Sequence, residues 1–155
     1  MKRRFSSAST SPVNELERAL ALLTEGTHTC VLCKNGQLMT SDRRGIAPLL
    51  SWLEQGDCLQ NASVADKIIG KAAAMLLILG GAKAVYGQVM THTARDLLEK
   101  AGMETAYGDL VQTIINRKGD GPCPMELAVR DLTEPGLAPQ ILRKTLQGLQ
   151  NATGE

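Results

Sequence analysis

Apolar residues at helical spacing alternate with short β-rich runs along most of the chain. The apolar positions of residues 13–25 recur on one side of a helix, which predicts an amphipathic helix closed by Gly26. The runs 27–34 and 37–40 are rich in strand-forming residues, and Asn35-Gly36 between them predicts a tight hairpin. A short helix is expected to follow over residues 46–54.

The middle of the chain predicts a buried helix. Ser63 and Asp66 match a capping box, and residues 64–79 would be apolar on nearly every side of the helix that it opens. Gly80-Gly81 is expected to end this helix.

The second half of the chain continues the alternation. We expect a strand over 84–90, an amphipathic helix over 91–101 and a strand over 103–107. Residues 109–116 fit a helical turn and a strand equally well. Two C-terminal helices are expected, the first near 125–132 and the second starting near Pro139.

This order of elements predicts an α/β fold. A hairpin followed by alternating helices and strands indicates a mixed sheet with helices on both faces, in a three-layer α-β-α arrangement. Residues 1–12 are basic and rich in Ser and Thr, so we expect a flexible tail before a single domain over residues 13–155.

Composition excludes several function classes. With 17 Lys and Arg against 16 Asp and Glu, the net charge is +1, and aromatic residues are only 3% of the chain. This balance argues against a nucleic-acid partner and an anionic membrane partner. The apolar stretch 72–79 is too short to span a bilayer, and no signal-peptide pattern is seen. The four cysteines form no disulfide framework, so we expect a reduced, cytoplasmic protein.

The predicted order resembles the cytidine-deaminase-like fold. In zinc deaminases the buried helix starts with His-x-Glu and the next helix with Pro-Cys-x-x-Cys, and these motifs hold and use a Zn²⁺ ion. The segment ARDLLEKAGM, residues 94–103, is similar to the helix after the second zinc cysteine. This alignment puts Thr91 and Ala94 at the cysteine positions, Ile69 at the histidine position and Lys71 at the glutamate position. The resemblance therefore implies the fold without zinc chemistry, and no metal or cofactor is expected.

Residues 13–150 as a whole resemble a small uncharacterised prokaryotic family with this deaminase-like fold. The segments ADKIIGKAAAMLL (65–77), IINRKG (114–119) and CPMELAV (123–129) carry the resemblance. It implies a fold, because the family has no established activity.

Lys71 and Asp66 are the first candidate site residues. A lysine in the apolar surroundings of the predicted helix can act as a base, a Schiff-base former or a phosphate ligand. Alternatively, Lys67 and Lys71 share one solvated edge of that helix. Asp66 is either a helix cap or a ligand-binding residue.

Cys123 and Glu126 are candidates at the start of a predicted helix. A thiol at a helix start can be a nucleophile, although cysteine is often simply a small core residue. Glu126 is a candidate site carboxylate, but the helix dipole favours it there in any case.

The remaining candidates would bind a ligand. Asn116 and Arg117, followed by glycines, suit an anion-binding loop or an ordinary turn. Thr91 and His92 lie where a deaminase-like fold keeps its chemistry, or they only start a helix. Cys30 and Cys33 face opposite sides of a strand, so they cannot easily share a metal ion.

Three functions remain open from the sequence. The leading one is binding of a nucleotide or related phosphate-bearing small molecule, with Asp66, Thr91, His92, Asn116 and Arg117 as ligand-binding residues. The second is a non-zinc enzyme that uses Lys71 with Glu126 or Cys123. The third is a structural or interaction module with a degenerate site, for which the pattern allows a homo-oligomer.

Overall fold

A five-stranded mixed sheet organises the molecule. The computed structural model describes residues 14–153, so the predicted tail over 1–12 lies outside the described residues. The strands are β1 (Cys30–Lys34), β2 (Gln37–Ser41), β3 (Ser63–Ile69), β4 (Ala84–Thr91) and β5 (Glu104–Val111). Their order is β2-β1-β3-β4-β5, with β1 antiparallel to β2 and β3, and with β3, β4 and β5 parallel to one another. The predicted α/β class with a mixed sheet is confirmed.

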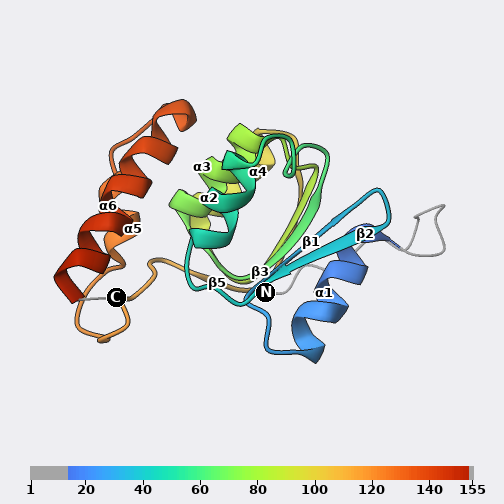
Figure 1. The fold of residues 1–155 in the computed structure, drawn as a ribbon, viewed down its shortest axis with the longest axis horizontal. Coiled ribbons are helices and arrows are strands. Elements are labelled where there is room, and N and C mark those ends of the chain that lie inside the picture. The colour runs from blue at the N-terminus through green and yellow to red at the C-terminus, as the bar shows by residue number, and fades with distance from the viewer. Residues whose placement is uncertain (1–13, 154–155) are drawn as a thin grey trace.

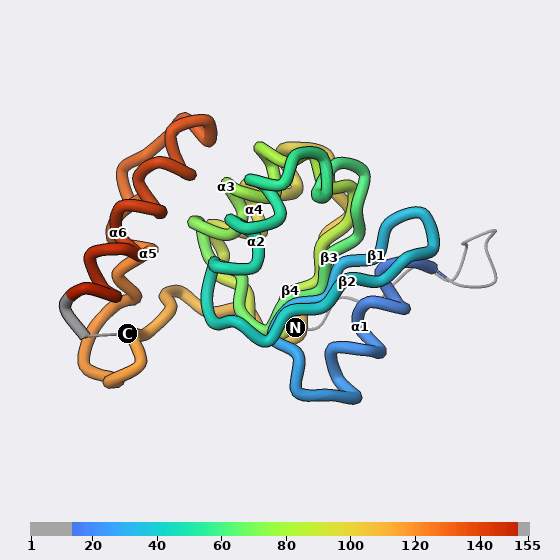
Figure 2. The backbone as a smooth tube through the Cα atoms, viewed as in Figure 1, coloured from blue at the N-terminus to red at the C-terminus, as the bar shows by residue number. Residues whose placement is uncertain are grey.

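Helices cover both faces of this sheet (Figure 1). The helices are α1 (Glu15–Glu25), α2 (Ala47–Glu54), α3 (Lys71–Gly80), α4 (His92–Lys100), α5 (Pro124–Val129) and α6 (Ala138–Thr153), and a 3₁₀ turn, η1 (Pro135–Leu137), precedes α6. Helix α1 packs on one face, while α2, α3 and α4 lie on the other. Helices α5 and α6 form a pair beside this second helical layer and contact α3 (Figure 2).

The core is divided between the two faces of the sheet. Neighbouring residues of a strand point to opposite faces, so Val64 joins the large cluster under α2 to α4 while Ala65 joins the smaller cluster under α1. Cys30 and Cys33 are divided in the same way, as expected from their spacing. Both faces of β3 are therefore buried over these residues.

The hairpin turn follows the sequence prediction. Asn35 and Gly36 have φ angles of 52° and 78°, and two positive angles in a two-residue turn match the right-handed twist of the strands. The turn fixes the register of β1 and β2, in which Lys34 pairs with Gln37 and Cys30 with Ser41.

The predicted helix over residues 64–79 is wrong in its first part. Ser63–Ile69 forms strand β3, and α3 begins only at Lys71, after Gly70. A strand buried on both faces is a continuous apolar run, so periodicity alone cannot distinguish it from a buried helix. Ser63 and Asp66 are therefore strand residues and not a capping box. Lys67 lies on the strand and shares no helical edge with Lys71.

The other predicted elements are present with small shifts. Strand β5 continues to Val111, so part of the ambiguous segment 109–116 is strand. Both predicted C-terminal helices are found. No helix among residues 14–153 is long and apolar enough to cross a membrane.

We predict that Leu142→Ala lowers the free energy of unfolding by about 2–5 kcal/mol. Leu142 is 0% exposed and anchors α6 in the large core cluster, so its truncation leaves a cavity. Urea denaturation measures the change. Leu137→Ala is the control, because Leu137 is 52% exposed and its truncation should change stability by less than about 0.5 kcal/mol. Equal effects of the two substitutions would contradict the observed packing of α6.

Candidate functional site

The carboxyl ends of three parallel strands bring the candidate residues to one edge of the sheet. Strands β3, β4 and β5 end at Ile69, Thr91 and Val111. Lys71 follows the first strand, His92 follows the second, and the loop with Asn116 and Arg117 follows the third. Ligands of open α/β sheets bind at this kind of edge.

Glu126 binds the start of α3 from a segment far away in the sequence. Its Oε1 accepts a hydrogen bond from the backbone N–H of Lys71 at 2.8 Å, and its Oε2 accepts one from Ala72 at 2.8 Å. Gly70, the N-cap residue, has no side chain to cap the helix. A Cβ atom at Gly70 would lie 2.3 Å from Glu126 Oε1, so the glycine leaves the room that this carboxylate occupies.

Lys71 strengthens the same attachment. It is the first residue of α3, only partly buried, and its Nζ donates a hydrogen bond to the carbonyl of Arg130 at 2.7 Å. Cys123 is the partly buried N-cap residue of α5, three positions before Glu126. The structure thus brings Lys71 and Glu126 together, and each side chain bonds a backbone group of the other segment, which docks α5 on α3. A catalytic role for Lys71, Glu126 or Cys123 stays a prediction.

Thr91 and His92 start α4. Thr91 is 3% exposed, and its Oγ1 accepts a hydrogen bond from the N–H of Ala94 at 3.1 Å, as an N-cap does. His92 is partly exposed beside it. The two residues lie at the predicted edge, and Thr91 already has a structural partner.

The predicted anion-binding loop is an internally bonded turn. Asn116 Oδ1 accepts hydrogen bonds from the N–H groups of Gly119 and Asp120 at 2.8 Å and 3.2 Å, and its Nδ2 donates to Asp120 Oδ1 at 2.9 Å. These contacts hold the Asn116 side chain within the turn, and a ligand-binding role for Asn116 stays a prediction. Arg117 and Lys118 are exposed on it and bring positive charge to the edge.

Asp66 lies in a row of paired residues that crosses the sheet in the middle of β3, three residues before the carboxyl end of that strand. Cys30 pairs with Ser41 on one side and with Asp66 on the other, and Asp66 pairs with Gly87. Directly paired residues of a sheet share a face, so these side chains lie on the face under α2, α3 and α4. Cys30 is the first residue of β1 and Ser41 the last of β2, which places the row at the end of the hairpin.

The Asp66 carboxylate is buried and incompletely hydrogen-bonded. Asp66 is 5% exposed, and its Oδ1 accepts a hydrogen bond from the N–H of Ile68 at 3.4 Å. Within residues 14–153, its buried Oδ2 has no hydrogen-bond partner. Burial raises the pKa of Asp66 from 3.8 to about 7, against the opposing effect of the Ile68 N–H hydrogen bond and of the nearby Cys30 side chain. Burial and the neighbouring carboxylate raise the pKa of the Cys30 thiol well above its usual value.

The pairing of Cys30 with Asp66 is a feature that the sequence analysis missed. It depends on the register between β1 and β3, and β3 was not predicted. The β-branched residues Val64, Ile68 and Ile69, followed by Gly70, were the available signal for that strand. No group of three or more His, Cys, Asp or Glu side chains in the described part of the chain could hold a metal ion.

The fold and its edge define a mixed α/β protein with polar residues at the carboxyl ends of its parallel strands. A family model described as TM1506, a domain of unknown function (DUF1893), matches residues 18–146. The chain therefore belongs to the DUF1893 family, which confirms the prediction of an uncharacterised prokaryotic family. The comparison with curated proteins gave no match.

A solved structure supports the same fold. The crystal structure of a DUF1893 family protein, TM1506 from Thermotoga maritima, matches with a TM-score of 0.76 over 94% of this chain and 97% of that chain. The two sequences are 22% identical, so the likeness shows the fold alone. The resemblance to the cytidine-deaminase-like fold stays a prediction.

We predict that Glu126→Gln lowers the free energy of unfolding by roughly 2–4 kcal/mol, as measured by urea denaturation. A glutamine offers one acceptor oxygen to two N–H donors and turns its own N–H₂ group toward one of them. Glu134→Gln is the control, because Glu134 is exposed and should tolerate the change within about 0.5 kcal/mol. If both substitutions have the same small effect, Glu126 does not hold α5 on α3.

We predict that Asp66 makes the protein less stable as the pH rises from about 4 to about 7. The folded protein holds the Asp66 proton more tightly than the unfolded chain does, because burial raises the folded-state pKa from 3.8 to about 7. This contribution is fully present below about pH 4 and is lost as the pH passes through about 7. The difference of about 3 in pKa corresponds to an upper value of roughly 4 kcal/mol.

Urea denaturation at about pH 4 and about pH 8 tests this pH dependence. Asp66→Asn should flatten the profile relative to the wild-type protein. Asp57→Asn, which changes an exposed carboxylate, should retain the wild-type slope. A wild-type slope in Asp66→Asn would show that Asp66 titrates normally in the folded protein.

Proposed function

We propose that this protein binds a nucleotide-like small molecule, with an N–H donor at one end and a phosphate at the other, at the carboxyl edge of β3, β4 and β5. The observation that carries the proposal is the Asp66 carboxylate, whose buried Oδ2 has no hydrogen-bond partner among residues 14–153. Buried polar atoms in folded proteins are nearly always paired, so an unpaired one calls for a partner. A ligand N–H group supplies the donor that a carboxylate accepts.

The position of Asp66 suits recognition of a ligand. A carboxylate with a pKa of about 7 is strongly perturbed, and such groups concentrate at functional sites. The ionised form accepts a hydrogen bond from an N–H donor more strongly than the protonated form does. Ligand binding should therefore lower the pKa of Asp66, and affinity should rise as the pH increases from about 6 to about 8.

The phosphate would bind the positive charge at the same edge. Arg117 and Lys118 are exposed on the loop after β5, and His92 follows β4. Glu126 already occupies the N–H groups at the start of α3, so the phosphate is assigned to the loop side of the edge. Lys71 and Glu126 act in this proposal as positioning residues that hold α5 next to the site. The choice of a nucleotide rests on analogy with other open α/β sheets.

We predict that wild-type protein binds at least one of AMP, CMP, GMP and UMP, and that Asp66→Asn weakens binding about tenfold. Isothermal titration calorimetry at about pH 8 measures both affinities. Asp57→Asn is the matched control and should bind as the wild-type protein does. Titration with the corresponding nucleosides tests the phosphate, since Arg117→Gln should weaken binding of the nucleotide more than binding of the nucleoside.

Two results would overturn the proposal. One is the absence of saturable binding of all four nucleotides to folded wild-type protein. The other is equal affinity of the wild-type and Asp66→Asn proteins for the same nucleotide.

A further inference from the structure

A groove between α2 and α6 forms a second candidate binding site, separate from the carboxyl edge. It has a volume of about 380 Å³. Its lining residues come from the loop before α2, from α2 and from α6: Arg43, Ala47, Leu50, Ser51, Glu54, Arg143, Leu146, Gln147 and Gln150. Sites for small molecules commonly measure about 300–1,000 Å³, so the groove suits a small ligand.

The groove follows from how α6 is attached. Helix α6 packs mainly on α5, η1 and α3, with Ala138 and Leu142 fully buried in the core. Further along, residues of α6 and of α2 line the groove from its two sides. Figures 1 and 2 show α6 on the same side of the molecule as α2. An ion pair of 2.5 Å between Arg143 Nε and Glu54 Oε2 bridges the two helices at this groove.

The lining combines an apolar surface with positive charge. The half-buried Leu146 and the small exposed parts of Ala47 and Leu50 provide the apolar surface. Two guanidinium groups and one carboxylate line the groove, and the carboxylate of Glu54 is paired with Arg143. The positive charge of Arg43 is therefore not balanced by a carboxylate of the lining. Among the described residues, the Arg43 guanidinium has no hydrogen bond or ion pair.

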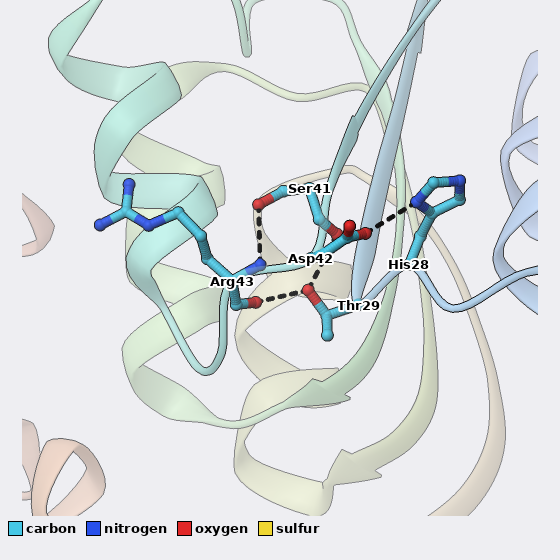
Figure 3. A network of polar contacts seen from close by, with 5 residues as sticks. All are labelled: His28, Thr29, Ser41, Asp42 and Arg43. Atoms are coloured by element: carbon cyan, nitrogen blue, oxygen red, sulfur yellow. Dashed lines mark hydrogen bonds and ion pairs between the residues drawn. The ribbon is translucent and has the colours of Figure 1, made fainter.

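The backbone of Arg43 is held in place by a polar network (Figure 3). The carbonyls of Ser41 and Arg43 both lie within hydrogen-bond distance of Thr29 Oγ1 and share its single O–H donor. Ser41 Oγ accepts a hydrogen bond from the N–H of Arg43 at 3.2 Å. The preceding residue, Asp42, contacts His28 Nδ1 at 2.9 Å. Figure 3 shows the Arg43 side chain pointing away from His28 and Asp42. A fixed backbone thus presents a guanidinium without a protein partner to the groove.

We propose that this groove binds a small amphiphilic anion, with a short apolar chain over Leu50 and Leu146 and a carboxylate or phosphate group on Arg43. A guanidinium binds both kinds of oxoanion through two parallel hydrogen bonds, which fix the position and orientation of the head group. The apolar chain gains free energy mainly by covering Leu146, because Leu50 is already only 4% exposed. This site uses none of the residues assigned to the nucleotide-like ligand, so it can exist whether or not that proposal holds.

Octanoate and octyl phosphate test the groove, with inorganic phosphate as the head group alone. Trp52 is the only tryptophan of the chain and lies on α2, so its fluorescence reports binding next to that helix. We expect saturable binding of at least one of the two amphiphiles, weaker binding of inorganic phosphate, and amide chemical-shift changes confined to α2, α6 and residues near Arg43. Comparison of octanoate with octyl phosphate shows which head group the site prefers.

Arg43→Gln should weaken binding of the preferred amphiphile at least about fivefold. Arg44→Gln is the matched control, because it removes the same charge from the next residue, which is exposed and does not line the groove. This control should change affinity less than about twofold. Equal weakening by both substitutions, or no saturable binding of either amphiphile to the folded protein, would overturn the proposal. Shift changes at β3 in place of α2 and α6 would assign binding to the other site and overturn it as well.

Discussion

The carboxylate of Glu126 at the start of α3 is the contact on which the arrangement of the C-terminal third depends. Helix α3 is buried along most of its length, and Gly70 gives its first N–H groups no side-chain acceptor. Buried donors without partners destabilise a fold, so the acceptor must come from elsewhere in the chain. Glu126 provides both oxygens from 55 residues away, and thereby fixes where α5 begins.

That attachment shapes both candidate sites. By holding α5 on α3, Glu126 and Lys71 place the loop of residues 112–123 over the carboxyl edge of the sheet, where Ile114 and Glu126 both lie against Gly70. Helix α6 follows α5, and its path beside α2 sets the width of the groove lined by Arg43. Lys71 and Glu126, which the sequence suggests as catalytic residues, thus make contacts that hold the C-terminal helices in place.

Local signals predicted the elements better than the contacts between them. The Asn35-Gly36 turn, the amphipathic helices and the strand before Thr91 follow from spacing and propensity, and all are present. Strand β3 was missed because a run buried on both faces lacks the alternation that marks a half-buried strand. Glu126 was singled out as a site carboxylate, but no local pattern indicates that its partners are the N–H groups of α3. Such partners depend on tertiary packing.

The surroundings of Asp66, on which the proposed function rests, depend on a strand pairing that the sequence could not predict. Its pairing with Cys30 follows from the register of β1 and β3, which burial of both faces of β3 constrains. Near neutral pH a buried carboxylate lowers stability, and Asp66 Oδ2 has no hydrogen-bond partner within residues 14–153. An apolar residue would serve the core better. A destabilising group in the middle of a central strand is the reason for proposing a ligand, since strain and unpaired polarity concentrate where proteins act on other molecules.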